Sequence, residues 1–159
     1  MNIEILTELR EYPSRYPNDI ENRHENQGLT IAEIETLEQA WNTGDRFPQA
    51  LRELLFLAGT YCHILDYNIH ENQQEMQEEI REAMQLRGDS FSRPFYIIDN
   101  YGGDQFLFVY LDEDQINPMV YEYGPGAPDR GRPLDRPLYS LSQLVHLGIT
   151  AVKEGINPM

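Results

Sequence analysis

Residues 104–111 include a run that is apolar on both faces of an extended strand. Side chains alternate between the two faces of a strand. Three aromatic side chains would therefore lie on one face and three aliphatic side chains on the other: Phe106, Phe108 and Tyr110, and Leu107, Val109 and Leu111. Both faces of such a strand must be covered by other parts of the chain. The run predicts a central strand in a layered domain.

The rest of the chain supplies candidate neighbours for this strand. We predict strands over residues 60–69, 94–99 and 118–123, a glycine turn over 100–103, and a long irregular loop over 124–137. Helices are predicted over 30–41, 48–58, 70–87 and 140–152. Two of these begin with a capping box, Thr30 with Glu33 and Ser140 with Gln143.

The first 28 residues have a weaker pattern. Ile3, Leu6 and Leu9 can form one stripe of a short helix, which Tyr12 and Pro13 would end. A polar, turn-rich stretch follows. We interpret residues 1–28 as an N-terminal helix with an irregular lead-in, and residues 29–159 as a single domain.

Charge restricts the possible partners. The 159 residues include 27 acidic and 12 basic side chains, which gives a formal net charge of −15. Nucleic acids and anionic membranes both attract Lys and Arg, so neither is an expected partner. A cationic protein would be attracted by complementary charge. The alternative is that acidity serves only solubility.

The chain contains a single cysteine, Cys62, and therefore cannot form an intramolecular disulfide or a multi-cysteine zinc site. Its first residues include two early acids and no long apolar run, unlike a secretory signal. No segment approaches the roughly 20 apolar residues of a membrane span. We expect a cytoplasmic protein.

Catalytic, cofactor-binding and metal-binding patterns are not apparent. Cys62 and His63 are adjacent in a predicted strand and would point to opposite faces, so Cys62 is interpreted as a buried apolar residue. Residues 112–114 resemble the start of a calcium loop, but Ile116 and Asn117 replace its next oxygen ligand and its glycine. We expect no enzyme activity, no cofactor and no metal site.

The order of motifs resembles the SUKH superfamily, which includes the Smi/Knr-like relatives of a yeast cell-wall-assembly regulator and many bacterial immunity proteins. The resemblance covers about residues 29–150. The matching segments are the opening helix pair, a Gly-Gly-Asp after a strand, the strands that follow it, and the closing helix: Leu29 to Glu38, Phe47 to Leu55, Gly102-Gly103-Asp104, Phe106 to Asp112, Val120-Tyr121 and Ser140 to Leu144.

The resemblance implies an α+β fold with a curved, mainly antiparallel β-sheet braced by helices. It also implies a non-catalytic protein that binds and neutralises a cognate polymorphic toxin. A basic nuclease is one toxin class that would suit the negative charge of this chain. The alternative is a regulatory or adaptor module that binds proteins without any toxin partner.

The predicted partner-binding residues combine carboxylates with an aromatic side chain near the ends of the predicted hairpin. Interfaces favour aromatic anchors, and nearby acids would attract a cationic partner. They are Asp99, Tyr101, Asp104, Asp112, Glu113 and Asp114. Asp104 could instead cap the Gly-Gly turn. The acidic flank of the helix over 70–87, from Glu71 to Glu82, is either a solvated face or a docking surface.

Overall fold

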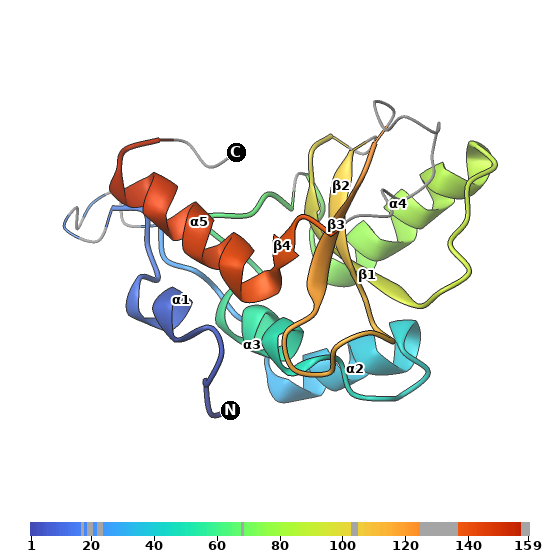
Figure 1. The fold of residues 1–159 in the computed structure, drawn as a ribbon, viewed down its shortest axis with the longest axis horizontal. Helices are drawn as coiled ribbons and strands as arrows, with labels where there is room; N and C mark the ends of the chain where they lie inside the picture. The colour runs from blue at the N-terminus through green and yellow to red at the C-terminus, as the bar shows by residue number, and fades with distance from the viewer. Residues whose placement is uncertain are drawn as a thin grey trace.

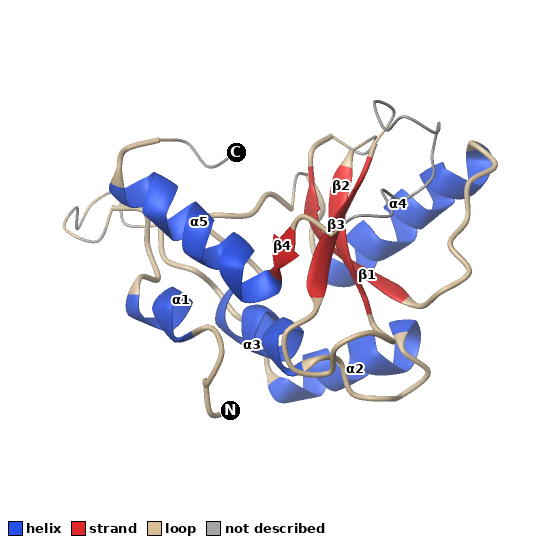
Figure 2. Ribbon diagram, in the orientation of Figure 1, coloured by secondary structure: helices blue, strands red, loops and turns tan. Residues whose placement is uncertain are grey.

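The computed structural model describes the chain except residues 17, 19–20, 22–23, 68, 103–104, 125–136 and 157–159. Within the described residues the chain forms an α+β fold of five helices and one antiparallel sheet (Figures 1 and 2). The helices are α1 (Thr7–Glu11), α2 (Ile31–Trp41), α3 (Gln49–Ala58), α4 (Gln73–Leu86) and α5 (Leu141–Lys153). The strands are β1 (Phe95–Asn100), β2 (Phe106–Tyr110), β3 (Met119–Tyr123) and β4 (Tyr139–Ser140), paired in the order β1-β2-β3-β4.

Helices cover both faces of the sheet, as the apolar pattern of residues 106–111 predicts. Helix α4 packs on one face, and α2, α3 and α5 pack on the other (Figure 1). On the α4 face, Met76 and Ile80 of the helix contact a cluster of sheet aromatics that includes Phe106 and Phe108. On the opposite face, Leu107 and Val109 join the larger core. Every residue of β2 is buried.

Local capping signals place two helices correctly. The Thr30 side chain accepts a hydrogen bond from the Glu33 amide, and the Glu33 carboxylate accepts one from the Thr30 amide. Ser140 and Gln143 form the same reciprocal pair at the start of α5. The two-residue strand β4, which the sequence pattern did not predict, immediately precedes that cap and pairs with β3.

The N-terminal segment is part of the main core. Leu6 and Leu9 are buried within the cluster formed by α2, α3 and α5. The buried carboxylate of Glu53 accepts hydrogen bonds from the backbone amides of residues 4, 5 and 6, at 2.7–2.9 Å. A short helix therefore forms within the predicted segment, beginning at Thr7, and the residues just before it are hydrogen-bonded to α3.

The prediction of a strand over residues 60–69 is wrong. The described residues of this segment contain only an isolated bridge, between Tyr61 and Gln27. The segment does run along the outer edge of β1, where the amide of Asn100 donates to the Asp66 carbonyl. The amide of Asp66, however, donates to the side chain of Asp99 rather than to a strand carbonyl. A side chain thus ends the ladder, and the apolar residues of the segment enter the core as a loop.

Candidate functional site

The predicted partner-binding residues fall into two separate groups. Asp99 and Tyr101 lie where β1 turns towards β2, whereas residues 112–114 follow the far end of β2. Strand residues advance about 3.3 Å each, so the length of β2 separates the groups by roughly 15 Å. Asp104 lies outside the described residues. The hairpin ends therefore do not form one continuous acidic site.

Asp99 is a buried carboxyl group that a bulge directs into the protein. The pairing of β1 with β2 shifts between Ile97 and Asp99, and bulges of this kind re-aim the side chain that follows them. Asp99 is only 2% exposed. Its carboxyl accepts hydrogen bonds from the Asp66 amide at 2.9 Å and from the Tyr101 hydroxyl. Burial nevertheless raises the pKa of Asp99 from 3.8 to about 7, with a smaller contribution from the nearby charge of Asp66.

Polar contacts continue from this end of β1 to helix α4. The side-chain amide of Asn100 lies 2.8 Å from Nε2 of His70. The other ring nitrogen, Nδ1, lies 3.1 Å from the Glu79 carboxylate, although the angles do not meet those of a hydrogen bond. Asn100 and His70 thus connect the sheet to Glu79 of α4.

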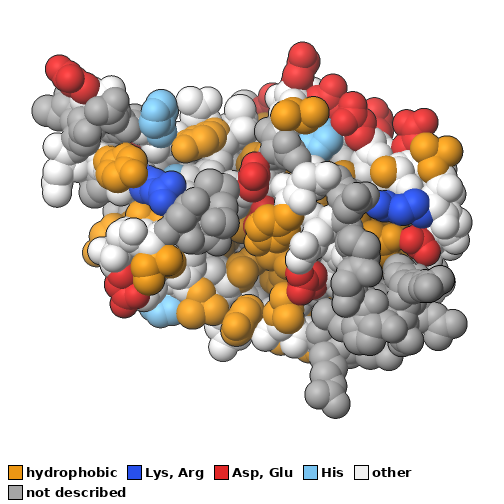
Figure 3. All heavy atoms as spheres, turned by 90° about the horizontal axis from the view of Figure 1, so that it is seen from above, with side chains coloured by type: hydrophobic (Ala, Val, Ile, Leu, Met, Phe, Trp, Pro, Cys, Tyr) orange, Lys and Arg blue, Asp and Glu red, His pale blue; other side chains and the backbone are white. Residues whose placement is uncertain are grey.

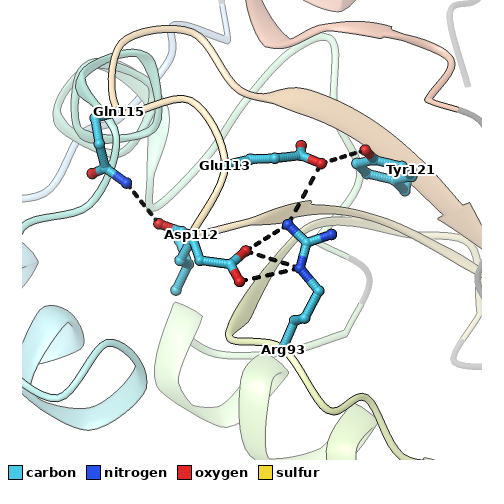
Figure 4. A network of polar contacts seen from close by, with 6 residues as sticks. Arg93, Asp112, Glu113, Gln115 and Tyr121 are labelled. Atoms are coloured by element: carbon cyan, nitrogen blue, oxygen red, sulfur yellow. Dashed lines mark hydrogen bonds and ion pairs between the residues drawn. The ribbon is translucent and has the colours of Figure 1, made fainter.

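The second group forms a network of structural contacts (Figure 4). Arg93 holds Asp112 through Nε and Nη2, with the shortest contact at 2.6 Å, and its Nη2 lies 3.5 Å from Glu113. Glu113 also accepts a 2.6 Å hydrogen bond from the Tyr121 hydroxyl. The hydrogen bonds from Arg93 lower the pKa of Asp112. Asp114 accepts from the backbone amides of residues 116 and 117, which lowers its pKa as well. These three carboxylates already have intramolecular partners.

Helix α4 carries an acidic outer face. Four of its glutamates lie opposite the buried residues of the helix, and a fifth precedes its first turn: Glu75, Glu78, Glu79 and Glu82, and Glu71. Among the described residues, none of the five pairs with a lysine or an arginine. Figure 3 shows acidic side chains gathered along one edge, in the half of the molecule that contains α4.

Arg81, the arginine within α4, points inward instead. The Arg81 guanidinium lies 4.1 Å from the ring centre of Trp41 and 4.2 Å from that of Phe95, and it donates to the Phe95 carbonyl at 2.7 Å. Burial lowers the pKa of Arg81 to about 10, so it remains charged at neutral pH. The positive charge of α4 is therefore held against aromatic rings, and its negative charges face outward.

Cys62 has the environment of a core residue, as predicted. It is 4% exposed, and burial raises the pKa of its thiol to about 12. The neighbouring imidazole of His63 contacts Asn26, with Nδ1 2.8 Å from the amide oxygen. Burial lowers the pKa of His63 to about 4. A thiol that stays protonated at neutral pH is a poor nucleophile.

Within the part of the chain that the structure describes, no three His, Cys, Asp or Glu side chains come together as metal ligands would. None of the described helices combines the length and the apolar character needed to cross a bilayer.

Comparison with known proteins gave no relative: no protein-family model, curated protein or solved structure matches this chain.

Proposed function

We propose that this chain is a non-catalytic protein-binding domain that acts as an immunity protein, neutralising a cationic toxin domain by docking onto it. The observation that carries the proposal is the outer face of α4. Its glutamates face solvent without Lys or Arg partners among the described residues, while Arg81 is buried against Trp41 and Phe95. A surface of this sign accelerates association with a positively charged partner.

Exposed apolar side chains at both ends of this face supply contact area. Leu86 is 83% exposed and lies one helical turn beyond Glu82, on the same side of α4. Ile69, which precedes the helix, is 86% exposed, and Tyr101 at the end of β1 is 40% exposed. Apolar anchors surrounded by charge are typical of protein interfaces. We name residues 69, 71, 75, 78, 79, 82, 86 and 101 the α4 surface.

The α4 surface also has an energetic cost. Glu75 and Glu79, and Glu78 and Glu82, are spaced four residues apart within α4, where like charges destabilise a helix by about 0.2–0.5 kcal/mol per pair. Solubility alone does not require the charges to be concentrated on one helix. A cationic partner would relieve this repulsion on binding. The toxin-neutralising role itself rests on the order of sequence motifs that resembles the SUKH superfamily, and a basic nuclease is the toxin class proposed.

The test is recovery of the partner with a matched pair of variants. The surface variant combines Glu78→Gln, Glu82→Gln and Leu86→Ala. The control removes the same charges and the same kind of side chain elsewhere, with Glu35→Gln, Glu154→Gln and Leu147→Ala, all at exposed positions. Wild-type chain and both variants are purified from native cells, and each co-purifying protein is identified by mass spectrometry and then expressed with and without this chain.

The expected partner is a basic protein that is toxic when expressed alone and harmless when the wild-type chain is present. The surface variant should associate at least tenfold more slowly than the control at low salt, and the difference should shrink in 0.5 M NaCl. A non-toxic partner would refute the immunity role and favour the adaptor alternative. Equal binding by both variants would show that the α4 surface is not the interface.

A further inference from the structure

A hollow of about 570 Å³ lies between segments that are distant in the sequence. Its walls come from the N-terminal segment, the start of α2, the α2–α3 loop, the first turns of α3 and the β2–β3 loop, which meet near the N-terminus in Figure 1. The size lies within the range of small-molecule sites, roughly 300–1,000 Å³. None of its lining residues belongs to α4. The hollow is therefore separate from the proposed docking surface.

Arg52 lines this hollow with part of its guanidinium unused. Its side chain is only 10% exposed, and Nη1 donates to Glu38 at 2.5 Å. Among the described residues, Nε and Nη2 of Arg52 have no hydrogen-bond acceptor, and neither is a fully buried atom. These two nitrogens form one edge of the guanidinium, which matches the two oxygens of a carboxylate. Arg93 uses the same edge to hold Asp112 in this protein.

A second arginine completes the positive side of the hollow. Arg46, in the α2–α3 loop, also lines it, and its guanidinium has no ion-pair or hydrogen-bond partner among the residues that the structure describes. Gln49 and Gln115 add side-chain amides to the wall. The hollow thus combines one buried cation, one cation without a partner among the described residues, one carboxylate and neutral polar groups, in a chain whose net charge is −15.

The surrounding acids limit the charge that a ligand can carry. Glu38 balances Arg52, and Glu53 also lines the hollow, although its carboxylate is occupied by backbone amides of residues 4–6 and by Gln49. Of these four charged side chains, Glu38 pairs with Arg52 behind the wall and Glu53 lines the hollow with Arg46, so together they carry no net positive charge. A dianion such as phosphate is therefore disfavoured. We infer that this hollow binds a monoanionic carboxylate, held by the Nε–Nη2 edge of Arg52 and by Arg46.

The test uses a matched pair of probes on the full chain. N-acetyl-alanyl-alanine carries a terminal carboxylate, and its C-terminal amide has the same shape without the charge. Each probe is titrated into the protein while side-chain amide signals of Gln49 and Gln115 are followed by NMR. Acetate and inorganic phosphate are titrated separately. Stronger binding of the peptide acid than of acetate assigns the site to a peptide C-terminus, and equal binding assigns it to small organic acids.

The acid should shift both glutamine signals and the amide should not. Arg46→Ala should weaken binding of the acid at least tenfold, whereas Arg10→Ala, which removes an exposed arginine elsewhere, should leave it unchanged. Arg52→Lys retains a charge for Glu38 but loses the planar edge, so it should also weaken binding, with the fold checked by circular dichroism. Equal binding of acid and amide, tighter binding of phosphate, or full binding by Arg46→Ala would each overturn the inference.

Discussion

The Asp99 carboxyl makes the stability of this protein depend on pH in a direction opposite to that of most acidic groups. Its pKa is about 7 in the folded chain, against an ordinary value of 3.8. Below pH 4 the carboxyl is protonated in both the folded and the unfolded chain. Between pH 4 and pH 7 only the folded chain keeps the proton, so the free energy of unfolding falls as pH rises.

The magnitude follows from the size of the pKa difference. One pKa unit corresponds to about 1.4 kcal/mol, so the carboxyl costs the folded state about 4 kcal/mol by pH 8. Asp99→Asn keeps the shape and an oxygen for the Asp66 amide, but it cannot ionise. The side-chain NH₂ group that the substitution introduces needs a hydrogen-bond acceptor. Without one, the folded variant loses about 1 kcal/mol of stability. We therefore expect the variant to be about 3 kcal/mol more stable than wild type at pH 8, and no more stable at pH 4.

Urea unfolding of both proteins at pH 4, 5, 6, 7 and 8 measures this difference, with Trp41 fluorescence and circular dichroism as independent signals. At each pH, the unfolding free energy of wild type is subtracted from that of the variant. This difference cancels the contribution of ionisable groups that the substitution does not affect. The difference in unfolding free energy should rise between pH 4 and pH 7 and then level off. A flat difference across this range would show that Asp99 is ionised throughout, and that burial does not control its charge.

Three other predictions concern groups whose environment is defined by the fold. Glu38→Ala should lower the free energy of unfolding by about 3–5 kcal/mol in urea, because it leaves the buried Arg52 without its partner. Glu78→Gln should raise stability by about 0.2–0.5 kcal/mol at low salt by relieving repulsion from Glu82, and the gain should disappear in 1 M NaCl. Cys62 should react with iodoacetamide at pH 8 at least a hundredfold more slowly in native protein than in 6 M urea, because the thiol is buried and protonated; equal rates would contradict this.

Features encoded by nearby residues were predictable from the sequence. The capping boxes at Thr30 and Ser140 each involve residues three apart, and both form as expected. The two apolar faces of β2 predicted a sheet covered on both sides, because alternation depends only on the strand itself. The antiparallel order β1-β2-β3 follows from turns short enough to join neighbouring strands.

Features that depend on distant contacts were not predictable. Residues 60–67 have strand-like composition, but Asp99, 33 residues beyond Asp66, takes the amide that a strand partner would need. The burial of Arg81 depends on Trp41 in another helix, so the pattern of α4 alone does not indicate it. Arg93 likewise gave no sign that it would neutralise residues 112 and 113, which lie about 20 residues away.

One signal for a buried ion pair was present in the sequence. Glu38 follows Ile34 by four residues and so lies on the apolar face of α2, while Arg52 lies between Leu51 and the buried Glu53 in α3. A charged side chain on a buried face requires a partner, and the two are joined at 2.5 Å. A charged residue in the apolar stripe of each of two neighbouring helices therefore predicts an ion pair between the helices. Neither helix alone identifies the partner.

Two acidic regions, residues 112–114 of the predicted site and the glutamates of α4, differ in what they can offer a partner. A cation approaching Asp112 or Glu113 must displace Arg93, whose Nη2 lies 2.6 Å from one carboxylate and 3.5 Å from the other. The glutamates of α4 have no Lys or Arg to displace among the described residues. Net charge alone gives equal weight to both regions, but carboxylates without a Lys or Arg partner retain more of their attraction for an external charge. The α4 surface is therefore the stronger candidate, because the fold directs its only arginine, Arg81, away from solvent.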